Sequence, residues 1–242
     1  TRFKCDWSSD VCSSDLRVVV GMGMVQETLR GFAGIDLSTL SGVLIDLDNT
    51  LYAYDPAHRA GLHAACARVA HWGPYEVVSK EYRAARDAVT ARLRGQGACR
   101  SRLFAFQSLC EGRGETAPYV LARELDRIYW RSFLDAMRVD GEALDFLKRC
   151  KHLALPVCVV TDMTAHVQVD KLLALGLSGL IDHLVTSEEV GIEKPDPRMF
   201  AAGLAKIGVT AAAAIMIGDD HDKDIKGAEA AGLRAVHYVA KA

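Results

Sequence analysis

Five short apolar segments, each about as long as a β-strand, constrain the fold of this 242-residue chain more than any other feature. A strand with one solvent-exposed face alternates apolar and polar residues. Several of these segments have no polar alternation, as is typical of parallel strands that are covered on both faces. They are GVLIDL (42–47), LPVCVVT (155–161), DHLVTS (182–187), AAIMIGD (213–219) and LRAVHYV (233–239).

Amphipathic helical patterns separate the later segments. Residues 164–176 form one such pattern, which ends at Gly176, and glycine favours the left-handed conformation that closes many helices. A second pattern covers 195–208 and begins with Asp196 and Pro197, which suit the cap and the first helical position. Strands that alternate with helices predict a doubly wound parallel α/β sheet.

Residues 56–140 have a different pattern, because four helical segments follow one another with no strand between them. The block is inserted after the first strand, so it lies over the carboxyl end of that strand, where ligands bind in open α/β sheets. We therefore interpret residues 56–140 as a helical cap domain, and residues 17–55 and 141–242 as the α/β core. The four helical segments are 57–72, 79–94, 99–112 and 117–137.

The first sixteen residues are excluded from the fold prediction. CDWSSDVCSSDL (5–16) has neither helical nor strand periodicity and lacks the apolar centre of a signal peptide. Translated back into DNA it resembles a common sequencing-library adaptor, so we expect residues 1–16 to be a translated artefact. A disordered tail rich in Ser and Asp is the alternative. Five scattered cysteines then remain, an odd number without CxxC spacing, which favours a reducing cytoplasm over secretion.

Charge and hydropathy give no indication of a nucleic-acid partner or of a membrane partner. The formal net charge is -2 and no run of five or six like charges occurs, so nothing indicates nucleic-acid binding. The longest apolar segments are well below the ~18 residues that a membrane-spanning helix needs. We expect a cytoplasmic protein with neither a nucleic-acid nor a membrane partner. Its oligomeric state has no signature in the sequence.

The first apolar segment runs into DLDNT (46–50), in which one leucine separates two aspartates. Two carboxylates ~4 Å apart repel by ~4 kcal/mol at an effective dielectric constant near 20. The turn that begins at Asn49 allows Asp46 and Asp48 to point toward one place. Something must therefore neutralise them.

Other polar groups follow three further segments. Thr161 ends VCVVT, Lys194 lies in EKPDP just before a helix, and four aspartates occupy GDDHDKD (218–224). Each has an ordinary structural explanation: an Asp-x-Asp turn is usually solvated, a threonine fits a strand, and a lysine fits a surface. Acidic residues near a helix start are commonly caps.

Together these groups indicate a reaction centre, because the carboxyl ends of parallel strands can meet in one crevice. Clustered carboxylates with room for water are suited to Mg²⁺. A lysine charge and a threonine hydroxyl are suited to an anion. Metal, carboxylates and anion ligands together predict phosphoryl transfer.

The chain resembles the haloacid dehalogenase-like hydrolase superfamily across residues 42–239. The four motifs of that family stand in order as DLDNT, VVT, EKP and GDDHDKD. The resemblance implies a Rossmann-like core with an α-helical cap of the first type, inserted between the first two motifs. It also implies catalysis through an aspartyl-phosphate intermediate.

The resemblance also implies a role for each motif residue. Asp46 would be the nucleophile, and Asp48 would protonate the leaving alcohol and then accept a proton from water. Thr161 and Lys194 would hold the phosphoryl oxygens, with Asn49 as a further substrate-binding residue. Lys194 would also balance the charge of Asp46.

Mg²⁺ would lie between Asp46, the carbonyl oxygen of Asp48 and Asp219. We expect Asp219 to be the direct ligand and Asp224 to act indirectly or through water, with Asp220 as a competitor for the direct role. Members of the family often have Asn before the last aspartate, whereas this chain has Lys223, which leaves the second acidic position open.

The leading functional prediction is a Mg²⁺-dependent phosphatase of a small phosphorylated metabolite. Haloacid dehalogenases and phosphonate-cleaving members resemble the core but lack an acid at the position of Asp48, which argues against both. A sugar-phosphate mutase keeps both aspartates and stays open as an alternative. A catalytically silent protein that binds a phosphorylated ligand is another.

Specificity is expected to come from the cap. GQGACRSRLFAF (95–106) places Arg100 and Arg102 beside two phenylalanines, after a turn that contains glycine. One interpretation is an arginine that binds a second anionic group of the substrate, such as a carboxylate. The other is surface arginines next to core phenylalanines. No residue selects a particular substrate.

Overall fold

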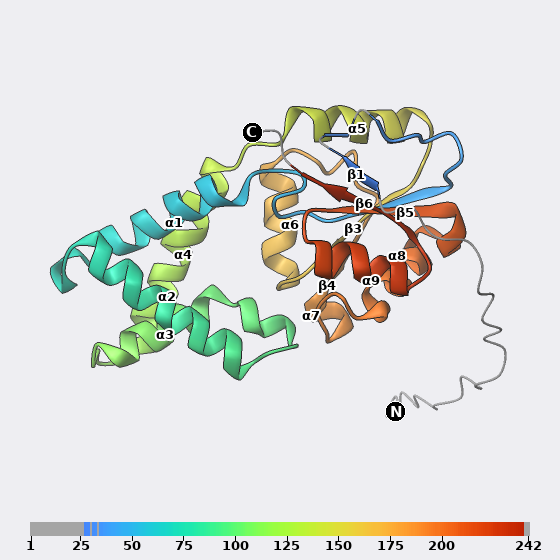
Figure 1. Ribbon diagram of the computed structural model, residues 1–242. Helices are drawn as coiled ribbons and strands as arrows, with labels where there is room; N and C mark the ends of the chain where they lie inside the picture. Colours follow the sequence, from blue (N-terminus) through green and yellow to red (C-terminus); the bar gives the residue numbers. More distant parts are fainter. Residues whose placement is uncertain (1–26, 30, 33, 240–242) are drawn as a thin grey trace, which may run out of the picture.

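The computed structural model describes residues 27–29, 31–32 and 34–239 of the chain. Six parallel strands form one sheet in the order β1-β6-β5-β2-β3-β4 (Figure 1), which confirms the predicted doubly wound α/β fold. From β2 the chain first moves outward through β3 and β4 and then crosses to the other side of β2. This reversal places a crevice at the carboxyl end of β2. The strands are β1 (Glu27–Leu29), β2 (Gly42–Ile45), β3 (Val157–Thr161), β4 (His183–Thr186), β5 (Ala214–Gly218) and β6 (Arg234–Tyr238).

Helices cover both faces of the sheet, which explains why its central strands β2, β3 and β5 are buried at every residue. In β2, Val43 and Ile45 belong to one hydrophobic core, and Leu44 between them belongs to the other. α5 (Gly141–His152) packs Phe146 into the first core, and α8 (Pro197–Ile207) packs Phe200 into the second. α6 (Ala165–Ala174) lies on the α5 side, and α9 (Lys226–Ala230) lies on the α8 side.

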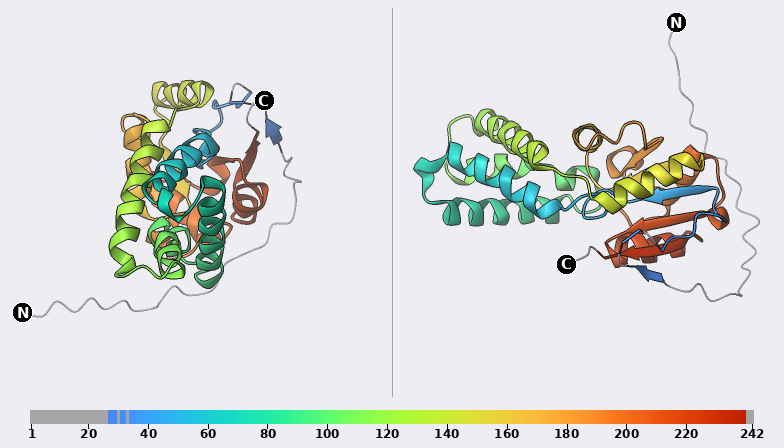
Figure 2. Two further views of the ribbon diagram at one scale, coloured as in Figure 1. Left: turned by 90° about the vertical axis from the view of Figure 1, so that its left-hand side faces the viewer. Right: turned by 90° about the horizontal axis from the view of Figure 1, so that it is seen from above.

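Four helices between β2 and α5 form a separate block beside the sheet, seen from three directions in Figures 1 and 2. The segment that leads into the block and the segment that returns from it lie side by side, where Asp140 N donates to Leu51 O at 2.8 Å. The block spans Tyr54 to Ala136, and its description as a cap domain of residues 56–140 stays a prediction. Its helices are α1 (Tyr54–Arg68), α2 (Tyr75–Arg92), α3 (Arg102–Gly112) and α4 (Pro118–Ala136).

Short elements connect the block to the sheet domain. η2 (Gly97–Arg100) precedes α3 and contacts α7 (Ser187–Val190), which follows β4. A π-helical turn, η4 (His221–Ile225), leads from β5 into α9. The other short helical turns are η1 (Ala70–Trp72) and η3 (Ala211–Ala213).

The structure contains elements that the sequence did not predict, and one prediction concerns residues that the structure does not describe. β1 and α5 were not predicted, whereas the five predicted strands are all present. Residues 1–16, predicted to be an artefact, lie outside the described residues. None of the helices in the described part of the chain is long and apolar enough to cross a membrane.

Candidate active site

The carboxyl end of β2 positions the first aspartate. Asp46 directly follows Ile45, and its backbone N donates to Ile217 O of β5 at 2.9 Å, so the residue is held between two central strands. Its side chain is almost fully buried. Thr50 Oγ1, one turn further on, donates to Asp46 Oδ2 at 3.4 Å. The orientation of the Asp46 side chain is therefore fixed at the carboxyl end of the central strands.

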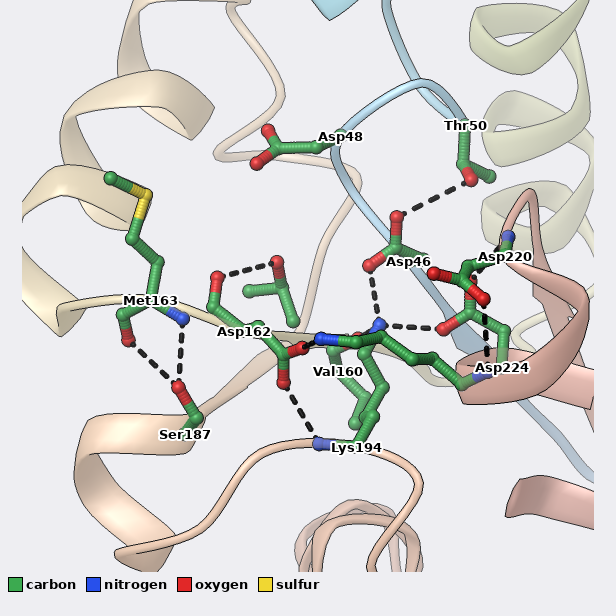
Figure 3. A network of polar contacts seen from close by, with 12 residues as sticks. Asp46, Asp48, Thr50, Val160, Asp162, Met163, Ser187, Lys194, Asp220 and Asp224 are labelled. Atoms are coloured by element: carbon green, nitrogen blue, oxygen red, sulfur yellow. Dashed lines mark hydrogen bonds and ion pairs between the residues drawn. The ribbon is translucent and has the colours of Figure 1, made fainter. Parts of the chain in front are cut away.

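Lys194 joins two of the predicted acidic residues (Figure 3). Its Nζ lies 2.6 Å from Asp46 Oδ1 and 2.6 Å from Asp224 Oδ1, and it donates to Val160 O at 3.0 Å. Burial would lower the pKa of Lys194, but the carboxylates of Asp224 and Asp46 outweigh burial and raise that pKa. Lys194 is therefore a charged ammonium group at the bottom of the site.

Three carboxylates form a candidate cation site. Oxygen atoms of Asp46, Asp219 and Asp224 all lie within 4.8 Å of one another. Burial raises the pKa of Asp46 well above its ordinary value, although Lys194 opposes this. Burial, followed by the charge of Asp224, raises the pKa of Asp219 to about 6. Carboxylates that repel one another in this way fit a hard divalent cation with oxygen ligands.

The neighbouring aspartates have other contacts. Asp220 accepts hydrogen bonds from the backbone N of Asp222 and of Lys223, so it caps η4 and stays outside the carboxylate cluster. Asp222 is exposed and pairs with Lys226. Asp224 Oδ2 accepts from Asp220 N at 3.1 Å, and its other oxygen is the one bound to Lys194. Both oxygens of Asp224 thus already have protein partners, as do both oxygens of Asp46, and Asp219 lines the same cavity as these two residues.

Asp48 is held apart from Asp46 by a second lysine, which sequence reasoning missed. Lys171 Nζ of α6 lies 2.7 Å and 2.9 Å from the two carboxylate oxygens of Asp48, and the Tyr52 hydroxyl donates to the same carboxylate. Figure 3 shows the Asp48 carboxylate directed away from Asp46. The expectation that both carboxylates point toward one place is therefore corrected, because each of them contacts its own lysine.

Lys171 is fully buried at the junction of the helical block and the sheet domain. Aromatic rings surround its ammonium group at 5.5–5.9 Å from their centroids, a distance at which a cation is attracted to the ring face. The sequence carried a signal for this residue: Lys171 follows the buried residues Val167 and Gln168 at helical spacing. A lysine within the buried stripe of a helix indicates a partner on another element. The rings are those of Tyr52, Tyr54, Trp130 and Phe133.

Thr161 and Asn49 both line the cavity that contains Asp46 and Lys194. Thr161 ends β3, and its Oγ1 accepts a hydrogen bond from Gln168 Nε2 at 2.6 Å. Asn49 has a positive φ of 63°, and its side-chain oxygen accepts from Tyr54 N at 3.1 Å. Asparagine tolerates this left-handed conformation better than most residues, so the turn after β2 favours its presence.

Asp162 connects three of the loops and was also missed. It accepts hydrogen bonds from the backbone N of Lys194, at 2.9 Å, and from Lys223 Nζ. Lys223, which stands where the family often has Asn, pairs with Asp162 and with Glu193. Its charge fastens the loop after β3 to the turn after β5.

Both predicted cap arginines line the same cavity of about 270 Å³. Arg100 Nε donates to Glu193 Oε1 at 2.9 Å. Arg102 is 7% exposed and donates to Arg100 O and to the Tyr54 hydroxyl. The interpretation of both as surface residues is wrong for Arg102, which is buried. A cavity of this size suits a small molecule.

A larger cavity of about 480 Å³ lies between α4 and α6. It contains none of the polar residues at the strand ends, so its volume alone does not make it the reaction centre. The five cysteines of the described region are free and buried.

Comparisons with known proteins identify the family of the chain. The family model of haloacid dehalogenase-like hydrolases matches residues 40–232. The chain is 35% identical over 201 residues to a ribulose-1,5-bisphosphate 5-phosphatase of Halopiger xanaduensis, which covers 82% of this chain and 84% of that protein. It is 26% identical over 201 residues to a glyceraldehyde 3-phosphate phosphatase of Methanocaldococcus jannaschii, or 83% and 85% of the two chains. Among solved structures, a 2-haloacid dehalogenase from Pseudomonas syringae pv. Tomato DC3000 has a TM-score of 0.67 at 25% identity, covering 82% and 86%.

Proposed function

The chain belongs to the haloacid dehalogenase-like hydrolases, and we propose that it is a Mg²⁺-dependent phosphatase that hydrolyses a small phosphorylated metabolite through an aspartyl-phosphate intermediate. One observation carries the proposal: a buried aspartate, a charged lysine and two further carboxylates converge at the carboxyl end of β2. Relatives named as phosphatases support the same reaction class.

The chemistry proceeds in two displacements at phosphorus. A carboxylate oxygen of Asp46 attacks in line, the bond from phosphorus to the ester oxygen breaks, and Asp48, which lines the same cavity, supplies the proton that the leaving alcohol needs. Asp48 then takes a proton from water, which attacks the same phosphorus and releases inorganic phosphate and the free Asp46 carboxylate. Lys194 and Thr161 hold the phosphoryl oxygens during both steps, with Asn49 beside them.

Asp46, Asp219 and Asp224, with the carbonyl oxygen of Asp48, are the residues that would hold Mg²⁺. The ion supplies charge neutralisation that allows an anionic phosphate to approach an anionic nucleophile. Asp219 is the strongest candidate for a direct carboxylate ligand besides Asp46, because its side chain is partly exposed, whereas Asp224 is 1% exposed and accepts hydrogen bonds at both oxygens. Asp224 then acts mainly by orienting Lys194.

Other functions of the family are less well supported. A dehalogenase has no leaving alcohol to protonate, so the acid at position 48 would have no role there. A mutase would also keep both aspartates, but it would transfer the phosphoryl group to a second sugar hydroxyl instead of to water. A silent phosphate-binding protein would not need every reactive position to be filled. The free buried cysteines favour a cytoplasmic enzyme.

The test is hydrolysis of p-nitrophenyl phosphate by the full chain, with Mg²⁺ and with EDTA. We expect turnover with Mg²⁺, and Asp46→Asn should lower kcat by at least about 10⁴-fold, because the amide of asparagine is not a nucleophile. Asp222→Asn is the matched control, since this exposed aspartate lies outside the cavity. Turnover by Asp46→Asn at the parent rate would refute the nucleophile assignment. Isomerisation of a sugar phosphate without phosphate release would favour the mutase.

A further inference from the structure

The cavity at the strand ends has four cationic side chains around it, and three of them are already paired with carboxylates. Lys194 contacts Asp46 and Asp224. Arg100 is paired with Glu193, and Lys223 with both Asp162 and Glu193. The fourth is Arg102, and no carboxylate of the described region lies within 4.0 Å of its guanidinium.

Aromatic groups and one carbonyl group surround Arg102. Its Nη1 donates to Arg100 O at 3.0 Å, and its Nη2 donates to the Tyr54 hydroxyl. The Tyr129 ring lies beneath it, with the centroid 5.9 Å from Cζ. Within the described region, Arg102 Nε and the Tyr82 hydroxyl are both buried without a hydrogen-bond partner.

The neighbouring histidine adds no second charge to this region. His58 Nδ1 lies 2.7 Å from the Tyr129 hydroxyl. Burial, followed by the positive charge of Arg102, lowers the pKa of His58 to about 4. His58 is therefore neutral at pH 7, and Arg102 supplies the local positive charge.

A buried guanidinium without a counter-ion is costly, because the interior does not replace the water that solvates it in the unfolded chain. Arginine is also the side chain whose planar donors best match a carboxylate or a phosphate. Because Arg102 lines the cavity that contains Asp46, an anion bound there would belong to the same molecule as the reacting phosphate.

We propose that Arg102 is the counter-ion for a second anionic group, a carboxylate or a phosphate, on the substrate. The preferred substrates are thus small phosphate esters that carry another anionic group. Arg100 has only a supporting role, because Glu193 already neutralises it and its backbone oxygen positions Arg102. This inference rests on the proposed phosphatase function.

The kinetic test compares substrates that differ only in the second anion. In the first pair, 3-phosphoglycerate carries a carboxylate that glycerol 3-phosphate lacks. In the second pair, ribulose 1,5-bisphosphate carries a second phosphate that ribulose 5-phosphate lacks. The parent should prefer the doubly anionic member in at least one pair, as measured by kcat/KM. Arg102→Met should lower this preference by about ten- to a hundred-fold, the usual effect of a charged hydrogen bond. Arg102→Lys should restore part of it.

Two further variants show whether the effect is local. Arg113→Met makes the same chemical change after the other end of α3, where Arg113 pairs with Glu81 outside the cavity, and it should leave the preference unchanged. Arg100→Met should change the preference less than Arg102→Met does. A preference that survives Arg102→Met, or that depends on Arg100 instead, overturns the proposal. So does a parent enzyme without preference in either pair.

A binding arm separates this inference from the proposed function. Calorimetry on Asp46→Asn measures the affinity for both members of each pair without turnover, with and without Arg102→Met. If the parent hydrolyses nothing, the phosphatase proposal fails, while the ratio of affinities still tests Arg102. An affinity ratio that Arg102→Met leaves unchanged refutes the second-anion site, whatever the enzyme hydrolyses.

Discussion

At the scale of single residues, the two aspartates of DLDNT differ in their counter-ions. Asp46 contacts Lys194 at the bottom of the site, and Asp48 contacts Lys171 at the junction with the helical block. Lys171 in turn lies among rings from both parts of the molecule, including Trp130 and Phe133 of α4. The position of Asp48 therefore depends on how the helical block sits on the sheet domain.

The first prediction concerns Lys171→Met, which keeps the length and apolar stem of the side chain but removes its charge. Without the ammonium group, Asp48 loses two hydrogen bonds and is no longer held in position. We expect kcat for an alkyl phosphate such as glycerol 3-phosphate to fall by about 100-fold, in the range that general acid catalysis contributes. The fall with p-nitrophenyl phosphate should be less than about 10-fold, because p-nitrophenolate leaves without being protonated.

The comparison of leaving groups also identifies the role of Lys171. If Lys171 only supported the fold, both substrates would lose the same factor, and that result would contradict a role in positioning Asp48. Gln168→Met, on the neighbouring turn of α6, is not a suitable control, because Gln168 contacts Thr161. Lys151→Met is suitable, since Lys151 is exposed and lies on α5.

Most residues of the candidate site could be predicted from the sequence, because strand ends of a parallel sheet meet at one edge. That rule brought together Asp46, Lys194 and Asp224 from three distant segments, and in the structure Lys194 contacts both aspartates. Lys171 could not be placed in this way. It comes from the middle of a helix, and its partner depends on the packing of that helix against the block.

At the scale of elements, the contact between η2 and α7 fastens the helical block to the sheet domain. A Cβ atom on Gly97 would lie 2.6 Å from both the N and the Cα atom of Glu188, so the two backbones touch where no other residue fits. Beside this contact, Cys99 and Arg100 both donate to Glu193. The same short element therefore sets the position of the cavity arginines.

The second prediction is that Gly97→Ala displaces η2 from α7. The displacement moves Arg100 and Arg102 relative to Asp46, and a shift of about 1 Å in a positioned group can cost about 100-fold in rate. We expect kcat/KM for the best substrate to fall by about 10- to 100-fold while the far-ultraviolet circular dichroism stays unchanged. Gly112→Ala is the matched control, because nothing lies within 4 Å of its added Cβ. Equal activity of both variants would contradict the proposed contact.

The sequence identified most strands and helices, but it missed the 12-residue helix α5 and some of the shortest elements. The five predicted strands follow from short apolar runs, and the four helices of the block follow from helical periodicity. β1 has three residues and depends on pairing with β6 at the edge of the sheet. The π-helical turn of η4 depends on Asp220, whose carboxylate caps two successive backbone N–H groups. Neither has a period long enough to be recognised.

At the scale of the whole molecule, the site has more negative than positive charge at the carboxyl ends of the central strands. Asp46, Asp219 and Asp224 share one lysine, so two negative charges remain when all three carboxylates are ionised. A divalent cation would balance them. Metal binding should therefore affect the stability of the whole fold as well as its activity.

The last prediction joins pH, metal and stability. The pKa of Asp219 is about 6 in the folded protein and about 3.9 in an unfolded chain. Its proton thus stabilises the metal-free fold fully below pH 4, and this contribution is lost as the pH rises through 6. Burial also raises the pKa of Asp46, so that group acts in the same direction.

The metal-free protein should therefore melt at a lower temperature at pH 7.5 than at pH 5. Mg²⁺ at about 100 times its Kd should raise Tm by about 5–10 °C at pH 7.5, where the carboxylates are ionised. At pH 5 the shift should be much smaller, because protons compete for the same oxygens. Asp219→Asn should flatten the pH dependence and remove most of the response to Mg²⁺, whereas Asp222→Asn should keep both. Differential scanning calorimetry with EDTA or Mg²⁺ measures this, and an Mg²⁺ shift that is equal at the two pH values would place the cation elsewhere.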